Sequence, residues 1–189
     1  MEQVTTSLRT QHPKRPIRYW SSDESRVGLL SVQRRKLTGC GVKPVGTTQW
    51  RFRYRWLYGV VDPRQGDSFV LEFSRLDSHC FERFLEEFSR QYPDELHVIQ
   101  VDNAGAHRAH HVDIPDNVVL LYQPPYCPEV NPIERLWGQM KQDFAWQQYA
   151  ELSELQEALS DWVKGLSKAM VKSLTGWHWL NTALADAGL

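Results

Sequence analysis

The sequence predicts an α/β fold in which a mixed β-sheet is flanked by helices. Apolar or alternating segments of strand length come first along the chain, and an amphipathic segment of helical period follows them. Further short apolar segments then alternate with helical ones. The first strand is predicted at residues 17–22 and runs directly into Asp23. Residues 26–38 mix apolar and basic side chains and are predicted as a second strand.

The next two strands are predicted to form an antiparallel meander. Arginine and aromatic residues alternate strictly over residues 51–56, so a strand there would place Arg51, Arg53 and Arg55 on one face. Residues 58–61 continue this strand. A turn with Pro, Gly and Asp follows, and residues 68–73 return as the neighbouring strand.

Helices and short strands are predicted for the rest of the chain. Asp77 or Ser78 can cap a helix that runs to about Gln91, because four apolar residues share one of its faces. Short apolar strands are expected at residues 96–101 and 118–122. A helix opens at the Asn-Pro pair at 131–132, and a final amphipathic helix covers residues 152–166.

Length and composition indicate one globular domain with a tail. The 189 residues are 41% hydrophobic, which suits a single core. We predict a flexible basic arm at 1–16, the main domain at 17–150, and a helical extension at 151–189 that packs on it. No run of 18 apolar residues occurs, so no membrane span is expected. The three cysteines are far apart and odd in number, which favours free thiols in the cytoplasm.

Charge is distributed unevenly along the chain. The net charge is −1, but residues 1–65 hold 13 Lys and Arg against 4 Asp and Glu. Residues 66–189 hold 9 basic against 19 acidic residues. Clustered cations of this density can bind a polyanion through counterion release. The alternative interpretation is a pair of oppositely charged, solvated surfaces.

Three carboxylates stand at positions where catalytic groups collect. Asp23 follows the first strand, Asp102 ends an apolar strand, and Glu134 lies in the first turn of a helix. Mg²⁺ prefers carboxylate oxygens, and a pair of such ions can serve phosphodiester chemistry. Each residue also has a structural interpretation. Asp23 could be an exposed surface carboxylate and Asp102 part of a turn, while Glu134 could complete a capping box if Asn131 is the N-cap.

Two motifs resemble those of the mariner-like DDE transposases, in particular their bacterial insertion-sequence branch. The stretch VIQVDNAGAH at 98–107 is similar to the second-aspartate motif of that family. The stretch QPPYCPEVNPIERLW at 123–137 resembles its long third motif, with Cys127 where the family usually has Ser. The Asp-Glu pair at 23–24 is similar to the first motif. The resemblance covers about residues 17–145.

This resemblance implies an RNase H-like fold and a catalytic triad of Asp23, Asp102 and Glu134 that binds two Mg²⁺ or Mn²⁺ ions. It also implies hydrolysis at transposon ends, followed by attack of the freed 3′-hydroxyl on target DNA. Glu129 matches a family glutamate that is not a ligand. The 31 residues between Asp102 and Glu134 are slightly fewer than the family commonly has.

The implied partners are double-stranded DNA, both transposon ends and target, on the bacterial nucleoid. Family members normally carry helix-turn-helix modules before the catalytic domain, whereas 22 residues precede Asp23 here. A separate helix-turn-helix polypeptide, a homodimer, or both are therefore expected as partners. Two alternatives stay open: an inactive or co-opted DNA-binding descendant of a transposase, and a related nuclease that cuts without strand transfer.

Further site residues are predicted around the triad. Asn103 and His107 are candidates to orient a carboxylate or water near the metals, although both could simply shape the loop. Zinc binding by His107, His110 and His111 with Cys127 is disfavoured, because no Cys-x-x-Cys pair is present. The candidate phosphate-binding residues are Arg34, Arg35, Lys36, Arg51, Arg53, Arg55 and Lys141.

Overall fold

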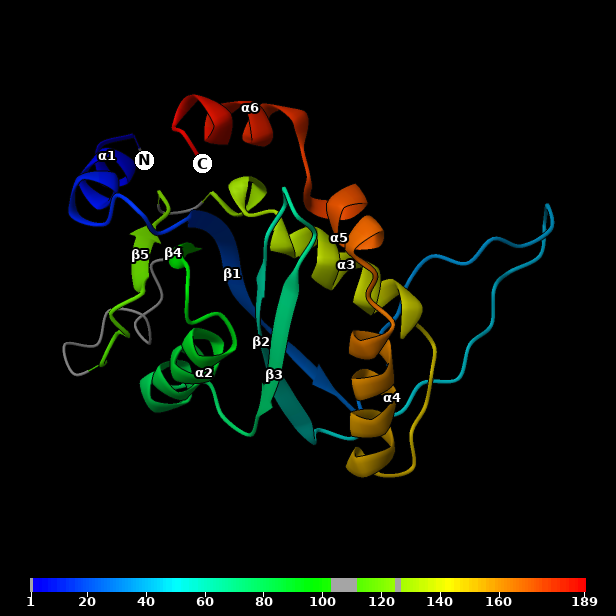
Figure 1. Cartoon of the computed structure of the whole chain (residues 1–189). Helices are drawn as coiled ribbons and strands as arrows, with labels where there is room; N and C mark the ends of the chain where they lie inside the picture. Colours follow the sequence, from blue (N-terminus) through cyan, green and yellow to red (C-terminus); the bar gives the residue numbers. More distant parts are fainter. Residues whose placement is uncertain (1, 103–111, 125–126) are drawn as a thin grey trace.

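A five-stranded mixed sheet forms the centre of the protein, which we describe from a computed structural model over residues 2–102, 112–124 and 127–189 (Figure 1). The strand order is β3-β2-β1-β4-β5. The central strand β1 (Ile17–Gly28) pairs antiparallel with β2 (Tyr54–Val61), which pairs antiparallel with β3 (Ser68–Phe73). On its other side β1 pairs parallel with β4 (Leu96–Val101), and β4 pairs parallel with β5 (Val118–Tyr122). The predicted α/β mixed sheet is therefore confirmed.

Helices cover both faces of the sheet (Figure 1). One face is covered by α2 (Ser78–Gln91). The other is covered by α3 (Ile133–Asp143), followed along the chain by α4 (Leu152–Lys164) and α5 (Lys168–Thr175). The last helix, α6 (His178–Asp186), packs on Tyr19 near the start of β1. Among the residues described, no helix is both long and apolar enough to cross a membrane.

The core under α2 is rich in aromatic side chains. Asp77 caps the helix as predicted, because its side chain accepts a hydrogen bond of 2.9 Å from the backbone N–H of Cys80. The helix then buries a stripe of residues three and four apart against the even-numbered residues of β1 and β2. This cluster contains Trp20, Tyr58, Val60, Phe81, Phe84, Leu85, Phe88, Ile99, Val101 and Val118.

The core under α3 joins the sheet to the C-terminal helices. Trp137 packs against the backbone of Gly59, where a Cβ atom would stand only 2.8 Å from the indole ring. The glycine therefore lets α3 approach β2 closely. The cluster contains Val27, Leu29, Leu57, Val61, Ile133, Leu136, Trp137, Met140, Phe144, Leu152, Leu155, Leu159 and Val171.

A buried ion-pair cluster near the start of β1 fixes α5 to the sheet. The Arg18 guanidinium lies 2.6 Å from Asp62, 2.7 Å from Asp67 and 3.2 Å from Glu95. Lys168, the first residue of α5, reaches Asp67 at 2.7 Å. Two cations thus offset most of the charge of three carboxylates, and pairing of this kind is how folded proteins tolerate charge with little access to water.

The predicted second strand at residues 26–38 is wrong. Residues up to Gly28 complete β1, and the segment 29–53 that follows reaches away from the domain (Figure 1). We name this segment the arm. An isolated β-bridge from Val32 to Ala145 is one of the contacts that hold its base, and the Gln49 side chain donates to the carbonyl of Tyr149 as another. Further along the arm Leu37, Val42 and Val45 are exposed. A strand there would gain no stability from burying these apolar side chains.

Two further expectations need correction. Residues 1–16 were predicted as a flexible arm, but Glu2–Gln11 form helix α1, which buries Thr5 and Leu8. Arg9 of α1 donates a hydrogen bond to the carbonyl of Gly188, so the helix is held by the far end of the chain. The final helix is shorter than predicted, because α4 ends at Lys164 and two further helices follow.

Replacing Gly59 with Ala tests the close approach of α3 to the sheet. We expect Gly59→Ala to lower the free energy of unfolding by about 1–3 kcal/mol, because the new methyl group overlaps the Trp137 ring. Gly138→Ala is the matched control within α3. It meets no atom within 4 Å and should be neutral or stabilising by up to about 1 kcal/mol. Denaturant unfolding measures both, and equal stability of the two variants would contradict the packing described.

Candidate active site

Two of the three candidate carboxylates come from adjacent strands. Asp23 lies on β1, and Asp102 directly follows β4. In the parallel ladder Ser21 is opposite Gln100, and the same register continued by two residues brings Asp23 beside Asp102. Side chains of alternate residues share a face, so both carboxylates lie on the face of the sheet that α3 covers. The fold therefore joins two residues that are distant in sequence.

The third carboxylate is carried to the same place by α3. Gly59 is paired with Asp23 across β1 and β2. The side chains that contact Gly59 most closely on the helix side are those of Ile133 and Trp137, at the start of α3. Glu134 is the residue after Ile133 and is exposed. The first turn of α3 therefore stands over the strand position that holds Asp23.

Buried hydrogen bonds join β1 to the residues just before α3. The Ser21 hydroxyl donates to the side-chain oxygen of Asn131, and the Asn131 amide donates to the carbonyl of Ser22 at 3.0 Å. The Ser21 hydroxyl also accepts a bond of 3.4 Å from the N–H of Ile133. All three polar side chains are buried, at 2% exposure or less. We name this group, formed by Ser21, Ser22 and Asn131, the Ser–Asn clamp.

The Ser–Asn clamp replaces the capping box expected from the sequence. Pro132, not Asn131, is the N-cap of α3, and the N-cap residue makes no side-chain hydrogen bond to the helix. The Asn131 side chain is unavailable for capping because both ends of its amide are bonded to β1. Glu134 therefore belongs to a first turn that is held by the sheet rather than by its own residues.

A second group of polar hydrogen bonds begins at Tyr19, two residues before Ser21 on β1. The Tyr19 hydroxyl donates to the side chain of Gln100 at 2.6 Å. The Gln100 amide donates in turn to Gln123 at 3.1 Å and to the carbonyl of Val130 at 3.3 Å. Burial raises the pKa of the Tyr19 hydroxyl, so Tyr19 stays a neutral donor. These hydrogen bonds tie β1 and β4 to the segment that leads into α3.

Burial and neighbouring negative charges both act on Asp23. The pKa of this carboxyl is raised to about 8. The main cause is loss of solvent, and the negative charges of Glu134, Glu24 and Asp102 contribute to the same rise. The backbone N–H of Glu24 acts in the opposite direction. Among the described residues, neither Asp23 nor Glu134 forms an ion pair with Lys, Arg or His. The three acids are therefore close enough to repel one another.

The carboxylates of Asp23, Asp102 and Glu134 are suitable ligands for a hard divalent cation, although their present positions do not form a binding site. Carboxylate oxygens are the ligands that Mg²⁺ and Mn²⁺ take, and mutual repulsion among them is relieved by a cation. Within the described ranges, no three His, Cys, Asp or Glu side chains stand close enough together to hold a metal ion as they lie. The residues fit the ion by chemistry and position, and ion binding requires their side chains to turn inward.

Comparison with known proteins gives the family. A family model described as DDE superfamily endonuclease matches residues 18–156, which is most of the chain and includes all three carboxylates. This chain belongs to the DDE endonuclease superfamily. DDE endonucleases are polynucleotidyl transferases that use divalent metals, and the predicted family resemblance is confirmed.

The relatives of this DDE domain include an uncharacterised protein and several transposase structures. The protein y4pE/y4sA of Sinorhizobium fredii (strain NBRC 101917 / NGR234) is 32% identical over 92 residues, 48% of this chain and 68% of that protein. The Mos1 mariner paired-end complex with Mn superposes with a TM-score of 0.66 at 16% identity, and the Mos1 strand transfer complex with 0.65 at 15%. Both matches cover 100% of this chain but only 61% and 60% of Mos1 transposase. The predicted RNase H-like fold is thereby confirmed.

The structure places the three predicted triad residues of this DDE domain within electrostatic reach of one another. Asp23, Asp102 and Glu134 converge as described above. Asn103 and His107 lie outside the described residues, as do the histidines of the disfavoured zinc site. Their proposed roles stay predictions.

The candidate DNA-binding cations occupy three places around the DDE domain. Strand β2 begins only at Tyr54, so Arg51 and Arg53 precede it instead of sharing a strand face with Arg55. Arg53 pairs with Glu151 at 3.0 Å, Arg51 lies 3.9 Å from the same carboxylate, and Arg55 pairs with Glu72 at 3.0 Å. The remaining candidates are on the arm or on α3: Arg34, Arg35, Lys36 and Lys141.

Sequence reasoning missed the residues that position the triad. Ser21 and Asn131 look like an ordinary strand residue and an N-cap, and Gln100 is one polar residue within an apolar strand. A polar residue two positions before each candidate aspartate, at Ser21 and Gln100, is the signal that was available. On strands with period two, such residues share the face of the aspartate.

Replacing Ser21 with Ala tests the Ser–Asn clamp. We expect Ser21→Ala to cost about 1–3 kcal/mol of stability, because the Asn131 side chain and the Ile133 N–H each lose a buried partner. Ser25→Ala is the matched control on the same strand. The Ser25 hydroxyl is buried without a hydrogen-bond partner among the described residues, so its removal should be neutral or stabilising. A smaller loss for Ser21→Ala than for Ser25→Ala in denaturant unfolding would rule the clamp out.

Proposed function

We propose that this domain is the catalytic part of a DNA transposase that cleaves at transposon ends and joins the freed 3′-hydroxyl to target DNA. The observation that carries the proposal is that Asp23, Asp102 and Glu134 lie close enough for their charges to interact, where the first turn of α3 meets the sheet. Membership of the DDE endonuclease superfamily supports it. Mos1 transposase, which shares the fold, forms a paired-end complex with the left transposon end and a strand transfer complex, and these support the two reaction steps by analogy.

The proposed ligands of two Mg²⁺ or Mn²⁺ ions are the carboxylates of Asp23, Asp102 and Glu134. Ions bound there would activate the attacking oxygen and stabilise charge on the attacking and leaving oxygens. The contribution of the chain is positional. Adjacent strand positions set the two aspartates side by side, and the Ser–Asn clamp sets Glu134 above them. Binding of the ions then offsets the repulsion among these acids.

The proposed partners are transposon-end and target DNA duplexes, on the nucleoid in the cytoplasm. The cations of the arm at residues 29–53 would contact DNA phosphates, and contacts of this kind give binding without sequence preference. Recognition of a particular transposon end then requires further DNA-binding elements. We propose that a helix-turn-helix polypeptide or a second copy of the chain supplies them.

Substitution of the proposed ligands tests the mechanism. Asp102→Asn and Glu134→Gln should each lower metal-dependent cleavage at least about a hundredfold, because a lost ligand removes several kcal/mol of charge stabilisation. Glu129→Gln is the matched control, since Glu129 is an exposed acid five residues from Glu134 in the same motif. The assay measures nicking and strand transfer, in Mg²⁺ or Mn²⁺, with duplex DNA from the regions that flank the gene.

The outcomes of that assay separate the candidate functions. Equal activity of the wild type and both acid variants would refute the metal mechanism. Nicking without strand transfer would favour a nuclease. Binding of DNA by an inactive wild type, with Mg²⁺ and Mn²⁺ both tried, would favour a co-opted DNA-binding descendant.

A charge-removal experiment tests the proposed phosphate contacts. The pairs of Arg51 and Arg53 with Glu151 are more than half exposed and contribute at most about 1 kcal/mol, so DNA phosphates can compete for both arginines. Arg51→Gln with Arg53→Gln should weaken DNA binding and reduce the slope of log K against log salt by about 2. Arg83→Gln with Arg90→Gln on α2 removes two similarly exposed, paired arginines and should change neither quantity. Identical salt slopes for the two double variants would assign Arg51 and Arg53 to anchoring α4 instead.

A further inference from the structure

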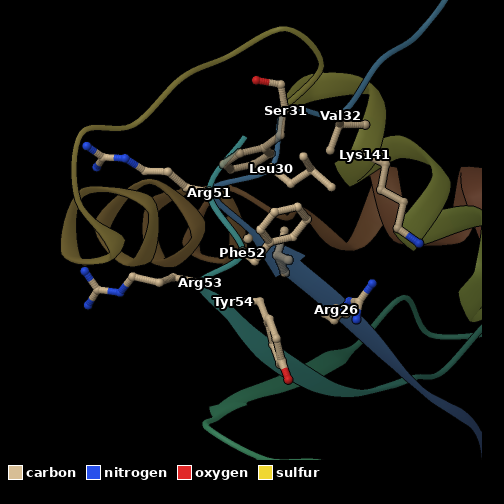
Figure 2. Close-up of a pocket in the computed structure, with 12 residues that line it drawn as sticks. Arg26, Leu30, Ser31, Val32, Arg51, Phe52, Arg53, Tyr54 and Lys141 are labelled. Atoms are coloured by element: carbon tan, nitrogen blue, oxygen red, sulfur yellow. The ribbon is translucent and has the colours of Figure 1, made fainter. Parts of the chain in front are cut away.

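An apolar cavity of about 270 Å³ lies where the arm leaves and rejoins the sheet (Figure 2). Its floor is made of core residues, because Val27 and Phe144 are both buried in the cluster under α3. Its walls are unusually exposed for such large side chains: Phe52 is 71% exposed, Tyr54 44% and Leu30 43%. An open apolar hollow with aromatic walls is a typical ligand site rather than a packing defect.

The cavity lies beyond the carboxylates along two elements that run in the same direction. Val27 lines the cavity and is four residues past Asp23 on the same face of β1, a rise of about 13 Å. Lys141 also lines it and is seven residues past Glu134 on α3, about 10 Å away and on the same helix face. A DNA strand held at the carboxylates therefore reaches the cavity within about three or four nucleotides.

The charges around the cavity are positive. Figure 2 shows Arg26 and Lys141 on one side of Phe52, with Arg51 and Arg53 pointing away on the other. The Arg26 guanidinium lies 5.2 Å from the centre of the Tyr54 ring. Among the residues that the structure describes, neither Arg26 nor Lys141 has a carboxylate within ion-pair distance. Their charge is thus available to an anionic ligand.

We propose that this cavity binds an unpaired nucleobase of the DNA strand that lies at the carboxylates, an inference that rests on the proposed function. Phe52 and Tyr54 would stack on the base, as aromatic side chains do in sites for single-stranded nucleic acid. Arg26 and Lys141 would contact the adjoining phosphates. A base stacked within a duplex cannot enter the hollow, so the site selects DNA that is single-stranded or locally opened.

A binding experiment with the full chain and Ca²⁺ tests the cavity without following cleavage. The probes are a blunt duplex and a duplex of equal length with a single-stranded overhang of about three nucleotides, which carries the fluorescent base 2-aminopurine. Phe52→Ala should weaken binding of the overhang roughly five- to hundredfold, remove the quenching of 2-aminopurine, and leave the blunt duplex unaffected. Phe52→Trp should retain both overhang binding and quenching. Trp179→Ala, an exposed aromatic residue of α6 away from the cavity, should change nothing.

Each result decides the proposal. Selective loss of overhang binding in Phe52→Ala, restored in Phe52→Trp, supports it. Equal loss for both probes, no loss for either, or no DNA binding by the wild type overturns it. If cleavage persists in Asp102→Asn while overhang binding depends on Phe52, the metal mechanism is refuted and the base-binding role of the cavity is supported. If cleavage needs Asp102 while overhang binding does not depend on Phe52, only the base-binding role of the cavity is refuted.

Discussion

The contact between the first turn of α3 and the centre of the sheet is the constraint on which the site depends. Trp137 packs on Gly59 where no larger residue fits, and Asn131 bonds to Ser21 and the Ser22 carbonyl. The apolar contact sets how close the helix comes, while the hydrogen bonds fix its position along β1, because they are directional and buried. Both are needed, since Glu134 is separated in sequence from the strands that carry its two partner acids.

Local patterns in the sequence predicted most elements, and long-range contacts account for the failures. The cap at Asp77 and the strands before Asp23 and Asp102 needed only neighbouring residues, so they were found. The use of Asn131 depends on a serine 110 residues away, and a capping signal at Asn131–Pro132 looks the same whether or not that serine is present. Helix α1 was missed for the same reason, because part of what holds it is the far end of the chain. The triad itself was recognised through its motifs, whereas Arg26 carried no motif and was overlooked.

Two acidic groups of residues lie beside the central strand, and their charges are compensated to different degrees. Near the start of the strand, Asp62, Asp67 and Glu95 surround Arg18, with Lys168 adding a second cation, so most of their charge is compensated within the chain. Five residues later, Asp23 is desolvated and repelled by Glu134 and Asp102, and the described residues supply no ion-pair partner to Asp23 or Glu134. A protein tolerates such uncompensated repulsion where a ligand supplies the missing charge, which is the reason to regard this place, and not the Arg18 cluster, as functional.

The parallel courses of β1 and α3 give the site a direction. Helix α3 presents Glu134 first and Lys141 about 10 Å later on the same face. Strand β1 presents Asp23 first and Val27 of the cavity floor about 13 Å later, also on one face. A polyanion that lay across the elements would meet acid and base side by side, whereas one that lies along them meets metal-binding groups at one end and phosphate-binding groups at the other. The second arrangement matches an extended DNA strand whose reacting phosphate is at the acids. The arm completes the proposed arrangement, because Phe52 lines the cavity at the second end, and a base that turned toward its ring would fix how far the strand can advance before its phosphate reacts.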